Sequence, residues 1–288
     1  MDYLIKAMLN DGRIRVYLAN STVVCLHAIE IHDLWPSAAS VLGKTMTIGL
    51  IMGAMLKNEE ALSIKIDGNG PIGQVIVDSN AKGTVRGYVT NPHVHFSKKG
   101  KLDDIITLGY NGYIDVIKDL KLKDLYTSTI EIQSGDLAKD FTYYFHHSEQ
   151  TPTLISLGVK INESNIPDIC GGILIQMMPD AKEEDIVYIE NKTNLLESMS
   201  HLLLQFNSLE EVLNYLFPNN HQILSKMPIY FKCPCNKESF ARGITTLGRS
   251  TINDIINEDG KAEIVCHYCR KVYNFSKQDL QAIKKGAR

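Results

Sequence analysis

"LSIKIDGNGPIGQVIVDSNAKGTVRGYV", residues 62–89, carries three short alternations of apolar and polar side chains with turn residues between them. The segments 62–67, 73–78 and 83–89 alternate with a period of two, which predicts strands buried on one face. Gly, Asn, Asp and Pro fill the gaps, and these are the residues that tight turns need. Strands joined by such short turns pair antiparallel, so this stretch predicts an antiparallel sheet.

The glycines inside this stretch, GNGPIG at 68–73, also match the dinucleotide-binding pattern G-x-G-x-x-G. That site needs a helix to begin directly after the glycines, because the amides of its first turn bind the pyrophosphate. Here Pro71 interrupts the loop and a strand resumes at once, so we interpret the segment as a hairpin turn.

The sequence on both sides of this stretch extends the same kind of domain. Strands in runs, rather than in regular alternation with helices, indicate an α+β fold instead of a doubly wound sheet. We therefore predict an α+β core domain with mostly antiparallel sheets over residues 1–178. Its further strands are expected at 13–19, 151–161 and 170–178, and its helices at 37–57 and from about Leu137.

Residues 179–229 change to helical periodicity after Met178-Pro179-Asp180. Asp180 and Glu183 have the spacing of a capping box, and a second short helix is expected from Ser208 to Phe217. Between residues 195 and 206, seven of twelve residues are apolar, more than one helix face can hold. This segment must therefore lie against another surface. We predict a helical linker, and the pattern leaves open whether it is metastable or packed permanently on the core.

The C-terminal segment, residues 230–288, contains four of the six cysteines, as Cys233-x-Cys235 and Cys266-x-x-Cys269. A domain this small buries little apolar surface and usually needs a metal or a disulfide. Four thiolates are a common ligand set for structural Zn²⁺. We predict a small zinc-binding domain with one Zn²⁺ and these four ligands. The other two, Cys25 and Cys170, lie in apolar surroundings and are expected to be buried.

The two cysteine pairs differ in how readily each could close into a disulfide. An extended two-residue step places the Cα atoms of Cys233 and Cys235 up to about 7 Å apart, whereas disulfides favour about 4.4–6.8 Å. Pro234 favours that extended conformation, so a bond here would be strained. Cys266 and Cys269 have the spacing of thiol–disulfide oxidoreductases, in which the bond closes readily.

Composition and charge argue against several other classes. The net charge is −3, and the basic residues of the C-terminal segment are scattered, which does not favour nucleic-acid binding. The longest apolar run, residues 41–56, is too short to span a bilayer and contains Lys44. The N-terminus lacks the apolar region of a secretory signal. We expect a cytoplasmic protein that binds neither membrane nor nucleic acid.

Two alternative functions remain open from the residues alone. A nucleic-acid-binding zinc ribbon would use the basic C-terminal segment. A thiol oxidoreductase would use Cys266 and Cys269 catalytically, although the βαβ context of a thioredoxin-like motif is absent. We expect no catalytic residues and no enzymatic activity.

The sequence resembles the 33-kDa chaperonin family of bacterial redox-regulated holdase chaperones. The resemblance covers essentially the whole chain and no block departs from the family's pattern. It is carried by MLKNEEALSIKIDGNGPIGQVIVDSNAKGTVRGYV (55–89), FTYYFHHSEQTPT (141–153), GGILIQMMP (171–179) and the C-x-C…C-x-x-C pattern.

This resemblance implies an ATP-independent holdase that is inactive when reduced and zinc-bound. It implies that Cys233, Cys235, Cys266 and Cys269 bind zinc, and that oxidative stress forms the disulfides Cys266–Cys269 and Cys233–Cys235. Given the strain argued above, we expect Cys266–Cys269 to close first. Zinc release, unfolding of the linker and homodimerisation would follow, and the oxidised protein would hold unfolding client proteins.

Overall fold

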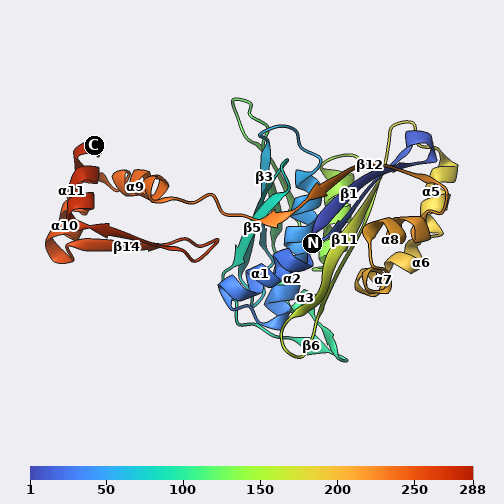
Figure 1. Ribbon diagram of the computed structural model, residues 1–288, viewed down its shortest axis with the longest axis horizontal. Coiled ribbons are helices and arrows are strands. Elements are labelled where there is room, and N and C mark those ends of the chain that lie inside the picture. The colour runs from blue at the N-terminus through green and yellow to red at the C-terminus, as the bar shows by residue number, and fades with distance from the viewer. Residues whose placement is uncertain (288) are drawn as a thin grey trace. The chain divides into compact units, whose positions relative to one another are not determined.

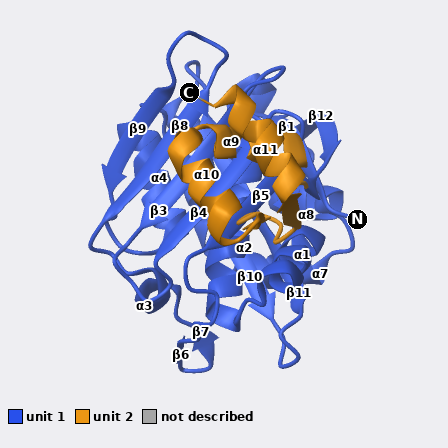
Figure 2. Ribbon diagram, turned by 90° about the vertical axis from the view of Figure 1, so that its left-hand side faces the viewer, with its two compact units in different colours: residues 1–231 blue, residues 232–288 orange. Residues whose placement is uncertain are grey.

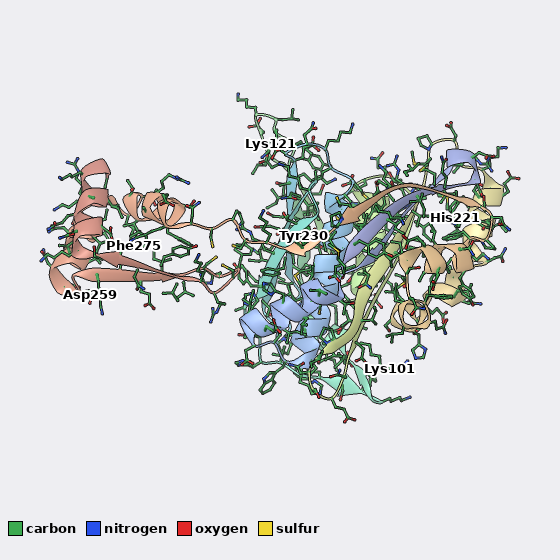
Figure 3. All side chains as sticks on the ribbon, in the orientation of Figure 1. Lys101, Lys121, His221, Tyr230, Asp259 and Phe275 are labelled. Carbon is green, nitrogen blue, oxygen red and sulfur yellow. The ribbon has the colours of Figure 1, made fainter. Side chains whose placement is uncertain are left out.

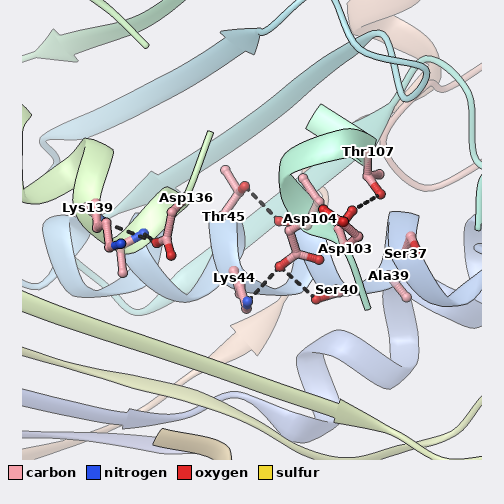
Figure 4. Close-up of polar contacts among 12 residues, drawn as sticks. Ser37, Ala39, Ser40, Lys44, Thr45, Asp103, Asp104, Thr107, Asp136 and Lys139 are labelled. Carbon is pink, nitrogen blue, oxygen red and sulfur yellow. Dashed lines mark hydrogen bonds and ion pairs between the residues drawn. The ribbon is translucent and has the colours of Figure 1, made fainter. Parts of the chain in front are cut away.

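Helix α2 (Pro36–Gly53) lies between two sheets and is buried almost all around (Figure 1). Sixteen of its eighteen residues are buried, as expected for a helix that is apolar on every face. Its one charged residue, Lys44, forms an ion pair with Asp104 at 2.6 Å, and Ser40 donates to the same carboxylate at 3.1 Å (Figure 4). The helix predicted at 37–57 is thus confirmed, with its end at residue 53.

The computed structural model describes residues 1–287 and divides into two units, Met1–Phe231 and Lys232 to the C-terminus (Figure 2). The mixed α+β fold with mostly antiparallel sheets is confirmed. None of the helices in residues 1–287 has the length and apolarity that crossing a membrane requires.

One sheet of the first unit is built around the stretch 62–89. Its order is β13-β5-β4-β3-β8-β9, and β3, β4 and β5 bury every second residue. Gly73 in the GNGPIG segment has φ +69 and leads directly into β4, so the hairpin interpretation is confirmed. The strands are β3 (Ala61–Asp67), β4 (Gln74–Asn80), β5 (Thr84–Val89), β8 (Tyr113–Asp119), β9 (Tyr126–Glu131) and β13 (Tyr230–Phe231).

The other sheet has the order β10-β11-β2-β1-β12 and is antiparallel throughout. Its edge strand β12 lies inside the segment that we expected to be helical, and it pairs with β1 from Tyr3↔Pro228 to Leu9↔His221. The strands are β1 (Tyr3–Leu9), β2 (Ile14–Asn20), β10 (Thr153–Ile161), β11 (Pro167–Met177) and β12 (His221–Pro228).

Four short helices cover the face of this sheet that points away from α2, and we call them the covering helices (Figure 1). They are α5 (Glu183–Glu190), α6 (Thr193–Leu196), α7 (Met199–Gln205) and α8 (Leu209–Leu216). Helix α8 begins after Ser208 as expected. The capping box expected at Asp180 is wrong, because α5 begins two residues later, with Lys182 at its N-cap and the carboxylate of Asp185 accepting from the amide of Lys182 at 2.9 Å.

Residues 179–229 therefore pack within the first unit in this structure. That they act as a separate, metastable linker between a 1–178 core and a 230–288 domain stays a prediction. The remaining elements of the first unit are η1 (Asn10–Gly12), α1 (Thr22–His32), α3 (Asp104–Leu108), α4 (Leu137–His147), β6 (Ser97–Lys98) and β7 (Lys101–Leu102).

The second unit has its own small core. Phe275 is 1% exposed and lies among the helices and the hairpin of this unit (Figure 3). Ile252 and Leu280 are fully buried beside it, from two different helices. The elements are α9 (Lys237–Thr245), α10 (Gly248–Glu258), β14 (Lys261–Val265), β15 (Val272–Ser276) and α11 (Lys277–Gly286).

Candidate metal centre

The two cysteine motifs meet at one end of the second unit. Cys233 and Cys235 lie in the extended segment before α9, and Cys266 and Cys269 lie in the turn between β14 and β15. That turn is tight because the amide of Cys266 donates to the carbonyl of Lys271 at 3.0 Å. Arg270 takes a left-handed conformation with φ 57, which completes the turn. The hairpin thus presents two thiols to the extended segment.

The four thiol sulfurs lie within 4.8 Å of one another, and residues 1–287 contain no other cluster of three or more such ligands. The sulfurs of Cys233 and Cys266 are 3.7 Å apart, and those of Cys235 and Cys269 are 3.3 Å apart. Tetrahedral Zn²⁺ with sulfur ligands at about 2.3 Å requires sulfur–sulfur separations of about 3.8 Å. All six cysteines are reduced. The chemistry and spacing of this donor set therefore fit Zn²⁺.

The sulfur of Cys235 has a second polar neighbour, the hydroxyl of Tyr273 at 3.2 Å. This hydroxyl also donates to the carbonyl of Cys235 at 2.9 Å, and the ring packs on Phe240. Burial acts to raise the pKa of Cys235, but hydrogen bonds from Tyr273 and from the neighbouring thiols outweigh it and lower the pKa to about 7. Burial raises the pKa of Cys269 to about 12. Tyr273 was not predicted to lie at this site, because its place in an alternating strand gives no sign of the contact.

Other thiol and imidazole groups of the first unit lie outside this cluster. Cys25 and Cys170 are buried in the first unit at 1% and 0% exposure, as expected. His93 is exposed and contacts the carboxylate of Asp33 at 2.8 Å. His95 is exposed beside it.

A second candidate functional surface lies beneath the covering helices. Met199, Leu202 and Leu203 of α7 are at most 5% exposed. They pack against apolar residues of β1, β2 and β11, which include Ile5, Ala7, Val16, Leu18, Ile173 and Ile175. If α7 separated from the sheet, the helix and the sheet would each expose an apolar surface. Such patches are typical of sites that bind other proteins.

Close backbone packing fixes α7 on the sheet. A methyl group added at Gly158 of β10 would lie 2.3 Å from the amide nitrogen of Ser200. On the neighbouring strand, a methyl group at Gly171 would lie 2.6 Å from a methyl of Leu203. Glycine at both positions lets the helix approach the sheet.

Two carboxylates anchor the covering helices to the rest of the first unit. Arg13 donates to the buried Asp185 at 2.7 Å, and this bond is the main cause that holds the pKa of Asp185 well below its usual range. Tyr3 donates to Glu210 at 2.6 Å, and Lys226 pairs with the same carboxylate. The covering helices are therefore attached by a few polar groups around an apolar centre.

Comparison with known proteins agrees with this architecture. The family model described as Hsp33 protein matches residues 2–276. The 33 kDa chaperonin of Bacillus licheniformis is 44% identical over 286 residues, with 99% of each chain covered. That of Bacillus subtilis is 44% identical over 286 residues, with 99% of this chain and 98% of the relative covered. The crystal structure of the 33 kDa chaperonin (Hsp33 homolog) from Thermotoga maritima matches with a TM-score of 0.89 and 31% identity, and covers 99% of this chain and 98% of that one. The chain belongs to the Hsp33 family of 33 kDa chaperonins.

Proposed function

We propose that this chain is a redox-regulated, ATP-independent holdase, inactive when reduced and zinc-bound and active when oxidised. The observation that carries the proposal is the cluster of four thiol sulfurs within 4.8 Å, built from one C-x-C and one C-x-x-C motif. Membership in a chaperone family supports the holdase part. Neither part requires catalysis, and we propose no enzymatic activity.

In the reduced state the four cysteines would hold one Zn²⁺. Bound zinc would join the extended segment to the β14–β15 hairpin and so stabilise the fold of the second unit. In zinc-finger peptides, zinc binding contributes about 10–16 kcal/mol to folding. The ligand set is Cys233, Cys235, Cys266 and Cys269. The hydroxyl of Tyr273 would orient Cys235 from outside the cluster.

Oxidation removes the ligands in pairs. A peroxide takes two electrons from the sulfurs of Cys266 and Cys269, is reduced to water, and leaves a disulfide. The same reaction then joins Cys233 to Cys235. The second bond forms later because Pro234 favours an extended chain, so the local fold must loosen first. Each disulfide removes two of the four thiolates, and the second unit loses its main stabiliser.

Release of the covering helices would expose the client-binding surface. Only Lys232 separates the second unit's Cys233 from β13, and β12 and α8 precede β13 in the chain. When these segments detach, apolar side chains of α7 and of the sheet reach solvent together. Unfolding proteins expose similar apolar surface, which gives binding without ATP. We further propose a homodimer in the oxidised state and a cytoplasmic location, where thiols stay reduced until stress.

Light scattering of a heat-unfolding client protein tests this function. Reduced, zinc-loaded protein should fail to suppress aggregation, and protein treated with peroxide at elevated temperature should suppress it. The variant Cys266→Ser/Cys269→Ser should lose the dependence on peroxide. Equal suppression by reduced and oxidised wild-type protein would refute the switch and leave a constitutive holdase. Catalytic reduction of insulin would instead support the thiol oxidoreductase, and a retarded nucleic-acid band the zinc ribbon.

A further inference from the structure

The two cysteines outside the cluster lie together in the core of the first unit. Cys25 is in α1 and Cys170 is in β11, 145 positions later in the chain. A methyl group added at Gly43 of α2 would lie 2.9 Å from the sulfur of Cys25 and 3.2 Å from that of Cys170. The thiol of Cys25 donates to the carbonyl of Ala39, one turn before Gly43 in the same helix, at 3.8 Å. The two sulfurs thus meet over one glycine of the central helix.

Polar groups surround the sulfur of Cys170 although the site is buried. The hydroxyl of Ser21 lies 3.4 Å from this sulfur and that of Thr47 lies 3.5 Å from it. The two hydroxyls are themselves 2.6 Å apart. A thiol that only fills space needs no such donors, whereas a thiolate is stabilised by them.

The hydrogen bonds make the two thiols unequal. The neighbouring Cys25 thiol, followed by hydrogen bonds from Ser21 and Thr47, lowers the pKa of Cys170 against the opposing effect of burial. The Cys170 sulfur beside it, together with burial, raises the pKa of Cys25. Because two hydroxyls lie beside the sulfur of Cys170, whereas the thiol of Cys25 donates to a carbonyl, Cys170 is the better nucleophile towards an oxidant. Cys25 is the adjacent thiol that can resolve the product.

The segment that leads to the second unit packs against the N-terminus and against α1, the helix that carries Cys25. The carboxylate of Asp2 accepts from the amide of Val24 at 2.8 Å, in the turn of α1 that carries Cys25. The carbonyl of Asp2 accepts from the amide of Ile229 at 3.3 Å. The ring of Phe231 packs on His27 of α1 with centroids 5.1 Å apart. Loss of residues 221–231 from the sheet would therefore release the first turns of α1.

We propose that Cys25 and Cys170 form a third redox pair, which a peroxide-class oxidant converts into a disulfide once residues 221–231 leave α1. The sulfur of Cys170 attacks one peroxide oxygen, the O–O bond breaks, and sulfenic acid and one water form. The thiol of Cys25 then attacks that sulfur, and the hydroxyl leaves with the thiol proton as a second water. Two thiols have lost two electrons to one peroxide. The disulfide ties α1 to β11 and so keeps the core folded while its covering helices are detached.

The dependence on residues 221–231 rests on the proposed function, but the chemistry of the pair does not. Peptide mapping of full-length, zinc-loaded wild-type protein reads the pair directly, without a measurement of chaperone activity. After peroxide treatment in the cold, both cysteines should be recovered as thiols. After the same treatment at a temperature that releases the covering helices, a linked peptide of Cys25 and Cys170 should appear. Protein that has formed both disulfides of the C-terminal cluster but retains Cys25 and Cys170 as thiols would overturn the proposal.

Two single variants test the asymmetry. In Cys25→Ala the sulfenic acid of Cys170 has no partner and should be labelled by dimedone, whereas in Cys170→Ala the remaining Cys25 should stay unlabelled. Phe231→Ala should speed formation of the linked peptide several-fold, and Tyr126→Ala, a matched change of an exposed aromatic residue on β9, should not. Circular dichroism confirms that each variant is folded. Equal labelling of the two cysteine variants, or an unchanged rate in Phe231→Ala, would overturn the assigned roles.

Discussion

Replacement of Gly158 by alanine should activate the chaperone without oxidation. The added methyl would lie 2.3 Å from the amide nitrogen of Ser200 and 2.9 Å from the carbonyl carbon of Met199, far inside contact distance. Strand β10 is held by its ladder with β11 and by α4 on its other side, so α7 is the element that must move. The perturbation therefore acts on the docking of the covering helices.

Two free energies set the size of the effect on α7: what the helix gains by burying its apolar side chains, and what the added methyl group costs. Met199, Leu202 and Leu203 are 1–5% exposed, and burial of each such side chain contributes about 1.5–3 kcal/mol. Overpacking by one methyl typically costs about 1–3 kcal/mol. A loss of this size raises the population of the detached state by about 5- to 150-fold. The helices should stay docked in most molecules, but detach far more often than in the wild type.

Limited proteolysis of reduced, zinc-loaded protein measures this population, because cleavage within residues 179–229 follows the detached fraction when reclosing is fast. We expect the cleavage rate to rise about 5- to 150-fold and client aggregation to be partly suppressed without peroxide. Gly243→Ala is the matched control, since a methyl there meets no atom within 4 Å. Unchanged cleavage in Gly158→Ala would refute the packing argument. Faster cleavage without any holdase activity would refute the assignment of the client-binding surface.

Three other changes have defined outcomes. Arg13 holds the pKa of Asp185 below its usual value, so the docking of α5 should be strongest above about pH 4 and weaken as the pH falls below it. Hydrogen exchange of the α5 amides measures this docking, and Asp185→Asn should abolish its pH dependence. Tyr273→Phe should weaken zinc binding by about 10- to 100-fold in competition with a chromophoric chelator, and Tyr215→Phe, an exposed control, should leave it unchanged. Removal of the metal from reduced protein should eliminate amide protection throughout the second unit, while the amides of β3–β5 stay protected. Retained protection in the second unit would show that zinc is not the main stabiliser of that unit.

Local patterns were sufficient to predict the centre of the fold. The alternation in residues 62–89 fixes which face of β3, β4 and β5 is buried, and the strand that resumes after Pro71 takes the place of the helix that a dinucleotide site requires. The apolar run at 41–56 predicted α2 because a helix with no polar face can only be buried. The cysteine spacing likewise predicted which four residues would meet.

Contacts between distant segments could not be predicted in this way. Strand β12 was missed because Leu224, Ser225 and Lys226 break its alternation, and an edge strand is fixed by its partner β1 rather than by its own sequence. The sequence around Cys25 and Cys170 does not indicate that the two lie close together, because their contact depends on Gly43 in a different helix, α2. The position of Tyr273 depends in the same way on how the hairpin folds back.

The pairing of β1 with β12 joins the first strand of the chain to one of its last. Residues 3–9 leave the ribosome early, but their outer edge stays unpaired until residues 221–228 have been made. At roughly 5–20 residues per second, this interval lasts roughly 10–45 s. During that time the nascent chain presents the same open sheet edge that the proposed detachment of β12 would expose again. This member of a chaperone family therefore presents an open, aggregation-prone sheet edge of its own during synthesis, until β12 pairs with it.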